Sequence, residues 1–431
     1  MNSVTLGDVM HLTGGFGLGI DYAVRLSLRL ADPIDAAVLA DAVQKTQQRY
    51  PYLSVRLCRN ETNYYYETNH LPVVLLNTAE RITLNSAESN YHVWAVCHDG
   101  DRLFLDISHG ICDGTGMYMV LSTLLYYYCS GRYGVTDHTG IRTLDDPVLP
   151  DESADPAELL PPLDPSGMPN PSLPEAFSLV NDGGLTPCEP VVYDIVIPED
   201  MFLAFTSAND ASPGTMISIL FSRAIDELFP EREKPLTNSY IINARPMLGA
   251  PNTHHNCVHT VRFDYTDRIR AMPFDRQCTV HRGTTFLQSD RERVCGSMMV
   301  QAARNRMVEQ RMPTLEAKTQ AYAQMLLGGK RLFTYMVSYV GQWKVHSLAP
   351  YITEFWTHVP NANNLLTEIA AVNGKIYLST HQNFREECVV RKFLELLERN
   401  NVPYTLRGPM DNDIARFPEP AAGYEKRPLG S

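Results

Sequence analysis

The fold of this chain is decided by one stretch of sequence, residues 102–128, which reads RLFLDISHGICDGTGMYMVLSTLLYYY. Its first part, residues 102–107, has the composition of a β-strand. Residues 117–128 are apolar over a length that predicts a buried helix. Residues 108–115 therefore form a loop at a strand end, where functional side chains commonly stand on a rigid support.

This loop carries an HxxxDG pattern formed by His109, Asp113 and Gly114. An imidazole titrates near neutral pH, so His109 could take a proton from a hydroxyl or an amine while that group attacks a carbonyl. Gly110 and Gly114 permit the tight turn that would let Asp113 fold back, in a structural role. The pattern predicts general-base acyl transfer. The alternative is a hydrogen-bonded loop histidine beside an Asp113 that caps the next helix.

The composition is that of a large globular protein. The 431 residues are 44% hydrophobic, which excludes disorder over the whole chain. Because 37 Lys and Arg stand against 49 Asp and Glu, the net charge is −12, and we expect no binding to nucleic acid. No apolar run reaches the roughly 18 to 20 residues of a membrane-spanning helix, and Asp8 stands where a signal peptide would carry Lys or Arg. We therefore expect a cytoplasmic protein without a membrane span.

Cysteines and glycines give weaker signals. The 9 cysteines contain no CxxC pair and are typical of reduced thiols. The densest group of metal-type ligands, His254, His255, Cys257 and His259, matches no zinc spacing, so we expect no metal. The glycine-rich segment 14–19 fits neither a dinucleotide-binding pattern nor a phosphate loop, and it predicts a flexible N-terminal loop.

The chain divides at a proline-rich segment. Prolines interrupt any helix and most strands over residues 146–190, which we predict to be a linker or crossover. It separates an N-terminal domain, residues 1–145, from a C-terminal domain, residues 191–431. Both parts mix strands and helices, which predicts an α/β fold. The predicted strands are 23–30, 91–97, 102–107, 191–197, 239–243 and 375–380, and the predicted helices are 34–49, 117–128, 213–228, 291–327 with a break near Pro313, and 388–397.

The HxxxDG loop and further segments, taken in order, resemble the chloramphenicol acetyltransferase-like superfamily, which includes condensation domains, alcohol acetyltransferases and polyketide-associated acyltransferases. The resemblance covers most of the chain. Its landmarks are 49–56 (RYPYLSVR), similar to the family's hPxLR segment, the helix 215–228, Asn243-Ala244-Arg245-Pro246, the strand 338–341, and the closing strand 374–384 with a QxF turn.

The resemblance implies two similar α/β domains arranged in a V, with a tunnel between them and His109 at its centre. The donor would be an acyl thioester on phosphopantetheine, carried by coenzyme A or by an acyl or peptidyl carrier protein. The small-molecule acceptor would be an alcohol or an amine, and no cofactor would be permanently bound. His109 would be the general base, and Asp113 would hold the loop by pairing with an arginine, for which we nominate Arg245.

Two departures from the family pattern affect the details. The family motif is HHxxxDG, and Ser108 stands here in place of the first histidine. The late DFGWG motif is represented only by residues 338–343, in which Tyr339 and Trp343 are candidates to line the tunnel. The backbone N–H of Gly114 and the hydroxyl of Ser338 are candidates to stabilise the oxyanion that forms when a thioester is attacked.

Three functions compete with an acyltransferase that uses acyl-coenzyme A. A condensation-type enzyme would take its donor from a separate carrier protein. A catalytically silent member would only bind a carrier, and Ser108 is its best support. A thioester hydrolase would share the base, but the chain lacks a GxSxG nucleophile elbow. Coenzyme A is favoured as donor because no carrier-like segment remains after the two domains are assigned.

Overall fold

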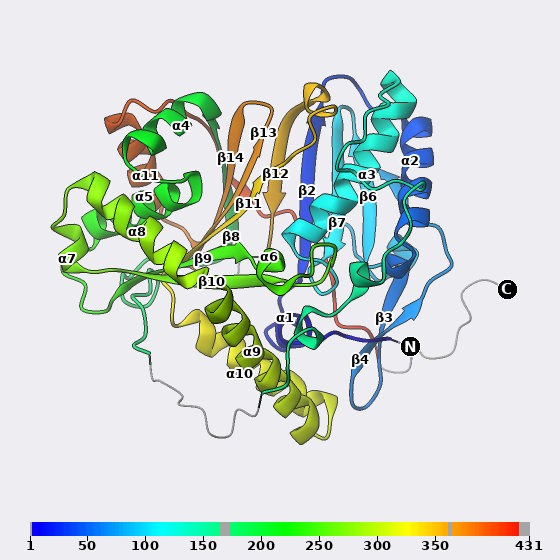
Figure 1. The fold of residues 1–431 in the computed structure, drawn as a ribbon, viewed down its shortest axis with the longest axis horizontal. Coiled ribbons are helices and arrows are strands. Elements are labelled where there is room, and N and C mark those ends of the chain that lie inside the picture. Colours follow the sequence, from blue (N-terminus) through cyan, green and yellow to red (C-terminus); the bar gives the residue numbers. More distant parts are fainter. Residues whose placement is uncertain (1, 164–172, 361–363, 422–431) are drawn as a thin grey trace.

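The computed structural model describes residues 2–163, 173–360 and 364–421. The chain forms two α/β halves, each built on its own large β-sheet, and the two sheets lie next to each other in the molecule (Figure 1). The mixed α/β class predicted from the sequence is confirmed. Residues 164–172 of the predicted linker lie outside the described residues.

The first half is built on a five-stranded sheet in the order β12-β2-β7-β6-β5. Helices α2 and α3 pack against each other beside this sheet (Figure 1). A small sheet, β1-β4-β3, lies at its lower end in that view. The elements of this half are β1 (Asn2–Ser3), β2 (Ala23–Leu30), α2 (Ala36–Arg49), η1 (Pro51–Leu53), β3 (Val55–Arg59), β4 (Tyr64–Thr68), β5 (Leu75–Asn77), η2 (Ala87–Ser89), β6 (Trp94–Asp99), β7 (Arg102–Ser108) and α3 (Gly114–Tyr133).

The second half is built on a seven-stranded sheet in the order β10-β9-β11-β13-β14-β8-β15. Its core helix α5 begins where the sequence predicts, because Ser212 caps the N-terminus and Pro213 fills the first turn. The elements of this part of the chain are β8 (Pro187–Pro198), α4 (Glu199–Ala208), α5 (Pro213–Leu228), β9 (Leu236–Asn243), α6 (Arg245–Leu248), β10 (Val258–Tyr265), α7 (Asp267–Arg270), α8 (Phe274–Gln288), α9 (Arg291–Arg311), α10 (Leu315–Lys330), β11 (Tyr335–Gln342), η6 (Ala349–Tyr351), β12 (Ile352–His358), which joins the five-stranded sheet, β13 (Leu365–Val372), β14 (Lys375–Phe384), α11 (Cys388–Arg399) and β15 (Thr405–Asp411).

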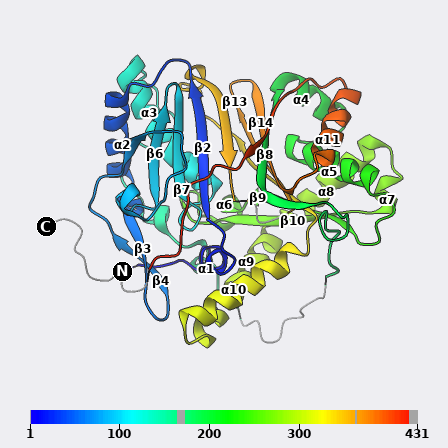
Figure 2. The same cartoon turned by 180° about the vertical axis from the view of Figure 1, so that it is seen from behind.

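Two segments from the end of the chain return to the first half. Strand β12 pairs antiparallel with β2, in the register Leu28↔Phe355, and so becomes an edge of the five-stranded sheet. After β15 the chain runs back across the molecule (Figure 2), and Phe417 packs into the core of the first half. The division into two domains at residues 146–190 stays a prediction. The second part of the chain contributes β12 to the five-stranded sheet, whereas all strands of the seven-stranded sheet come from the second part.

The proline-rich segment is pinned to the first half by a buried carboxylate. It contains two short helices, η3 (Pro150–Ser153) and η4 (Pro156–Glu158). Glu152 of η3 is fully buried and accepts two hydrogen bonds from Arg49, of 2.8 and 3.0 Å. Tyr52 donates a further bond of 2.8 Å to the same carboxylate. The described start of this segment therefore packs against the first half, in addition to connecting the two halves.

The glycine-rich segment near the N-terminus is a helix, so the predicted loop is wrong. Helix α1 (Val9–Gly17) packs against α10. A Cβ atom on Gly14 would lie 2.9 Å from the carbonyl oxygen of Tyr322 on α10, and one on Gly17 would lie 2.9 Å from that of Thr319. These glycines let two helix backbones approach closely, a requirement that outweighs their poor helix propensity and leaves no local sequence signal.

Within the ranges that the structure describes, no helix combines the length and the apolar character that a membrane crossing requires.

We predict that Gly14→Ala destabilises the protein although alanine is the better helix former. The added methyl group meets backbone atoms of α10, which cannot move away cheaply. We expect a cost of about 1 to 3 kcal/mol, measured as a lower Tm or a lower free energy of unfolding. The matched control is Gly296→Ala on α9, where a Cβ meets no atom within 4 Å; it should be stabilising by roughly 0.5 to 1 kcal/mol. Equal effects of the two changes would contradict the packing argument.

Candidate functional site

The HxxxDG loop joins β7 to α3 and is fixed at both ends. The backbone N–H of His109 donates to the carbonyl oxygen of Tyr22 (2.8 Å), which anchors the loop to the start of β2. Asp113 is the N-cap of α3, and its Oδ1 accepts from the backbone N–H of Gly116 (3.0 Å). The strand end and the helix start therefore hold His109 in one place.

Asp113 and Arg245 form a two-pronged ion pair. The guanidinium nitrogens of Arg245 lie 2.8 and 2.6 Å from the two carboxylate oxygens of Asp113, and both residues are buried. Burial alone would lower the pKa of Arg245, but the charge of Asp113 and their hydrogen bonds raise it above its ordinary value. Arg245 also donates to the carbonyl oxygens of Thr253 and His255. The structure thus brings together the two residues that the resemblance pairs.

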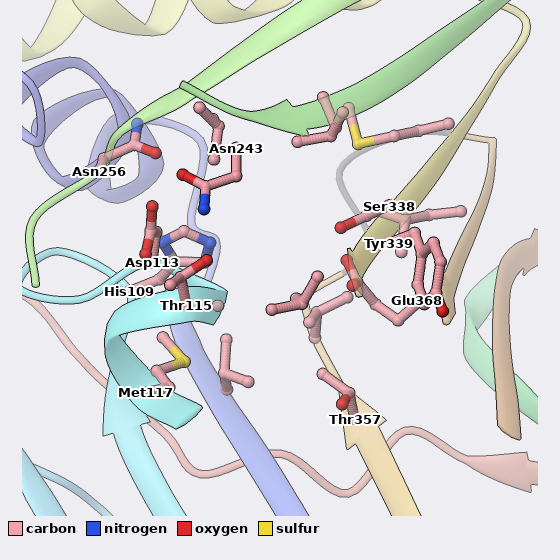
Figure 3. A pocket seen from close by; sticks show the side chains of 18 of the residues that line it. His109, Asp113, Thr115, Met117, Asn243, Asn256, Ser338, Tyr339, Thr357 and Glu368 are labelled. Carbon is pink, nitrogen blue, oxygen red and sulfur yellow. The ribbon is translucent and has the colours of Figure 1, made fainter. Parts of the chain in front are cut away.

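A cavity of about 170 Å³ lies beside this loop. Its lining comes from β2 and β12 of the five-stranded sheet and from β9, β11 and β13 of the seven-stranded sheet, so both halves build it. Figure 3 shows His109 on one wall, with Ser338, Tyr339 and Glu368 on the wall opposite. Most other lining side chains are apolar, among them Val24, Leu26, Met117, Ile241, Met336, Val340 and Leu366. The V-shaped arrangement and a tunnel open at both ends stay predictions of the resemblance.

His109 stands among aromatic and imidazole rings. Its ring meets that of Tyr22 edge-on, with centroids 5.4 Å apart, and its Nδ1 is buried without a hydrogen-bond partner among the described residues. His11 of α1 also lines the cavity, and the Tyr22 hydroxyl lies 3.1 Å from its Nδ1. Burial, together with the charge that the neighbouring His109 can carry, lowers the pKa of His11 to about 4. His11 is therefore neutral near pH 7.

The two oxyanion candidates both line the cavity, but they differ in availability. Gly114 begins α3, and a Cβ there would lie 2.9 Å from Val340 Cγ2, so glycine lets the helix start reach the opposite wall. The hydroxyl of Ser338 interacts with the carboxyl of Glu368. Of the two candidate donors, the Ser338 hydroxyl is therefore already engaged by another side chain.

Asn243, at the end of β9, offers a third donor that the sequence did not single out. Its Oδ1 accepts from the backbone N–H of Arg245 (3.0 Å). Because that N–H can only donate, the amide nitrogen of Asn243 must be on the other side, and Figure 3 shows it directed into the cavity.

Of the two tunnel candidates, Tyr339 lines the cavity and Trp343 does not. Trp343 is 6% exposed, packs against Phe355 and donates from Nε1 to Ser122 Oγ (2.8 Å) in the core of the first half. The reason lies in the backbone: the register of β11 shifts after Tyr339, and Gly341 has a φ of +104°. This irregularity turns the next residues away from the cavity, so the assignment of Trp343 is corrected.

Glu368 on β13 is a further lining residue that sequence reasoning missed, besides His11 and Asn243. Burial raises the pKa of its carboxyl to about 7, and the Ser338 hydroxyl only partly offsets this effect. The available signal was one charged residue in a mostly apolar strand, LLTEIAAV. For His11 there was no signal, because only the packing of α1 brings it to His109.

The residues that resembled metal ligands serve the scaffold. His255 Nδ1 lies 2.7 Å from Asp8 Oδ2, and His254 Nδ1 lies 3.1 Å from the Tyr52 hydroxyl. The backbone N–H of Cys257 donates to Asp113 (3.0 Å). Over the described ranges, no group of three or more His, Cys, Asp and Glu side chains is placed to hold a metal ion.

Comparison with known proteins identifies the fold. A scan against protein-family models and a search of curated proteins gave no match. Among solved structures, F. sporotrichioides TRI101 complexed with coenzyme A and T-2 is similar at a TM-score of 0.62 and 11% identity, over 94% of this chain and 99% of that one. Polyketide synthase associated protein 5 from Mycobacterium tuberculosis gives 0.59 and 12%, over 92% and 98%. The condensation domain of the monacolin K polyketide synthase MokA gives 0.60 and 12%, over 92% and 95%.

We predict that Asp113→Ala costs about 3 to 5 kcal/mol of stability, because it leaves the Arg245 guanidinium buried without its counter-charge. The measurement is equilibrium unfolding of the two single variants and of Asp113→Ala/Arg245→Leu. The double variant should lose clearly less than the sum of the single losses, since it leaves no unpaired charge. Glu395→Ala, which removes an exposed partner of Arg399, should leave the Tm close to that of the wild type. Additive losses would show that the two residues do not act as a pair.

Proposed function

We propose that the protein, which has the chloramphenicol acetyltransferase-like fold, is an acyltransferase that moves an acyl group from a phosphopantetheine thioester to an alcohol or an amine. One observation carries the proposal: His109 stands at a strand end, on the wall of a cavity that both halves line. Such a cavity can hold two reactants with the base between them.

In the proposed reaction His109 acts as the general base. The acceptor hydroxyl or amine must come within about 2.6 to 3.2 Å of a ring nitrogen, to which it gives its proton as it attacks the thioester carbonyl. A C–O or C–N bond forms, and a tetrahedral oxyanion results. When the intermediate collapses, the C–S bond breaks and the imidazolium returns the proton to the departing thiolate. Donor and acceptor thereby exchange an acyl group and a proton, with no net change at the enzyme.

The oxyanion needs hydrogen-bond donors, each of which contributes roughly 2.7 to 4 kcal/mol. We propose the Gly114 N–H for this role, with Ser338 as the second sequence-based candidate. The Asn243 amide is better oriented than Ser338, because the Arg245 backbone fixes it with the nitrogen toward the cavity. Asp113 and Arg245 act as positioning residues that touch neither reactant.

Coenzyme A is the donor we favour. TRI101 is similar to this chain over nearly its whole length and was crystallised with coenzyme A. The condensation domain of MokA supports the alternative of a donor on a separate carrier protein. A silent, carrier-binding role is the third candidate, but its main support is weakened: Ser108 is fully buried, accepts from the Gly110 N–H, and is not among the residues that line the cavity.

We predict that His109→Ala lowers acyl transfer by about 10²- to 10⁴-fold, the usual contribution of a general base. The assay is release of free thiol from a panel of acyl-coenzyme A donors, with mixed alcohols and amines as acceptors. The control is His70→Ala, which removes an exposed histidine that lies outside the cavity and should keep the wild-type rate. Undiminished turnover by His109→Ala would rule out the proposed base. Carrier binding without any turnover in the wild type would favour the silent role.

The donor can be identified separately by thermal stabilisation. A ligand at 100 times its Kd stabilises the folded state by about 2.7 kcal/mol. If coenzyme A carries the acyl group of the natural donor, coenzyme A should raise the Tm at concentrations where a phosphopantetheinylated carrier protein does not. The reverse order would identify the protein as a condensation-type enzyme acting in trans.

A further inference from the structure

Glu368 places an acidic group on the cavity wall opposite the base. It lies in the middle of β13, next to Ser338 of β11 in the parallel register and next to Ser379 of β14. Figure 3 shows its side chain on the wall that faces His109, together with Ser338 and Tyr339. The carboxyl therefore borders the same space that a reactant would occupy.

The fold supplies counter-charges for several buried carboxylates, but not for Glu368, which is half-buried on the cavity wall. Ion pairs hold Asp8 to His255, Asp106 to Arg25, Asp113 to Arg245, Glu152 to Arg49 and Asp194 to Arg407. The residues that line the cavity include no Lys or Arg. Arg245 is already paired with Asp113 and supplies no charge to Glu368. For Glu368, burial and the Ser338 hydroxyl are the influences on its carboxyl.

A carboxyl in an apolar site without a counter-charge is costly to keep. Binding cavities commonly contain a few placed polar groups of this kind, which orient the ligand against apolar walls. A cation from the ligand would complete the same kind of pair that the protein makes elsewhere. Because burial raises the pKa of Glu368 to about 7, part of the population is ionised at neutral pH, and a bound ammonium group would favour that form.

An ammonium group held by Glu368 has no lone pair and cannot itself be acylated. The group that attacks the thioester must be a second, neutral nucleophile at His109, on the other wall. The acceptor therefore needs two functional groups joined by an apolar spacer, in keeping with the apolar residues that line the rest of the cavity, such as Met117, Val340 and Leu366.

We infer that Glu368 is a specificity-determining residue that binds the ammonium group of a cationic acceptor, an amino alcohol or a diamine, whose other end is acylated at His109. The acylation of the acceptor at His109 rests on the proposed acyl transfer. The recognition of an organic cation by Glu368 rests on the cavity alone.

The first experiment compares acceptors of equal length and different charge. With an acyl-coenzyme A that supports turnover, kcat/KM is measured by thiol release for 6-amino-1-hexanol, 1,6-hexanediol and 1-hexanol. The wild type should prefer the amino alcohol by about tenfold or more, and Glu368→Gln should abolish this preference. Glu368→Lys should invert it in favour of 6-hydroxyhexanoate. Glu231→Gln, an exposed carboxylate outside the cavity, should leave the preference unchanged.

Equal kcat/KM for the amino alcohol and the diol, or a preference that survives Glu368→Gln, would overturn the inference while the acyltransferase proposal stands. A preference for the diol would show that a protonated Glu368 binds a hydroxyl group, and would also overturn it.

The second experiment does not depend on turnover. Hexylammonium should raise the Tm of the wild type and of His109→Ala, and should have no effect on Glu368→Gln. A stabilisation that depends on Glu368, in a protein that transfers no acyl group to any acceptor, would keep cation recognition and reject the proposed reaction. No stabilisation of the wild type, or equal stabilisation of Glu368→Gln, would reject cation recognition.

Discussion

The site depends on one buried ion pair, Asp113 with Arg245. Asp113 belongs to the loop after β7, and Arg245 follows β9, so the pair joins the two sheets at the point where the cavity lies. Two buried charges are stable together only when nearly all their hydrogen-bonding capacity is used. That condition is met, because Asp113 also accepts from Gly116 and Cys257, and Arg245 also donates to Thr253. The pair therefore fixes the position of His109 relative to the other half of the molecule.

Close packing around the pair explains two glycines next to the motif, Gly110 in the loop and Gly116 in the first turn of α3. A Cβ on Gly116 would lie 2.4 Å from the carbonyl oxygen of His254, and a Cβ on Gly110 would lie 2.7 Å from Leu12 Cδ1. Neither position has room for a side chain. The glycines thus allow the loop, the start of α3 and the segment after Arg245 to meet with little space between them, which keeps the HxxxDG loop rigid.

Charge is distributed in two ways in this protein. Carboxylates that support the scaffold are paired with arginine or histidine, as Asp113 and Glu152 are. The groups that face the cavity, His109 and Glu368, have no partner that neutralises or saturates them among the described residues. Polar groups left incomplete in a cavity are the ones available to a ligand, and this contrast is the basis on which we propose that His109 and Glu368, and not the paired residues, meet the substrate.

The sequence by itself determined the local parts of this protein. The strand, loop and helix around residues 102–128, the start of α5 at Pro213 and the break near Pro313 follow from periodicity, capping and proline chemistry, all of which act between near neighbours in the chain. Only the tertiary structure decided the rest. It made the glycine-rich N-terminus a helix, placed β12 in the other half's sheet, turned Trp343 into the core and brought His11 and Glu368 to His109. These outcomes depend on contacts between residues hundreds of positions apart, whose energies leave no repeating pattern in the local sequence.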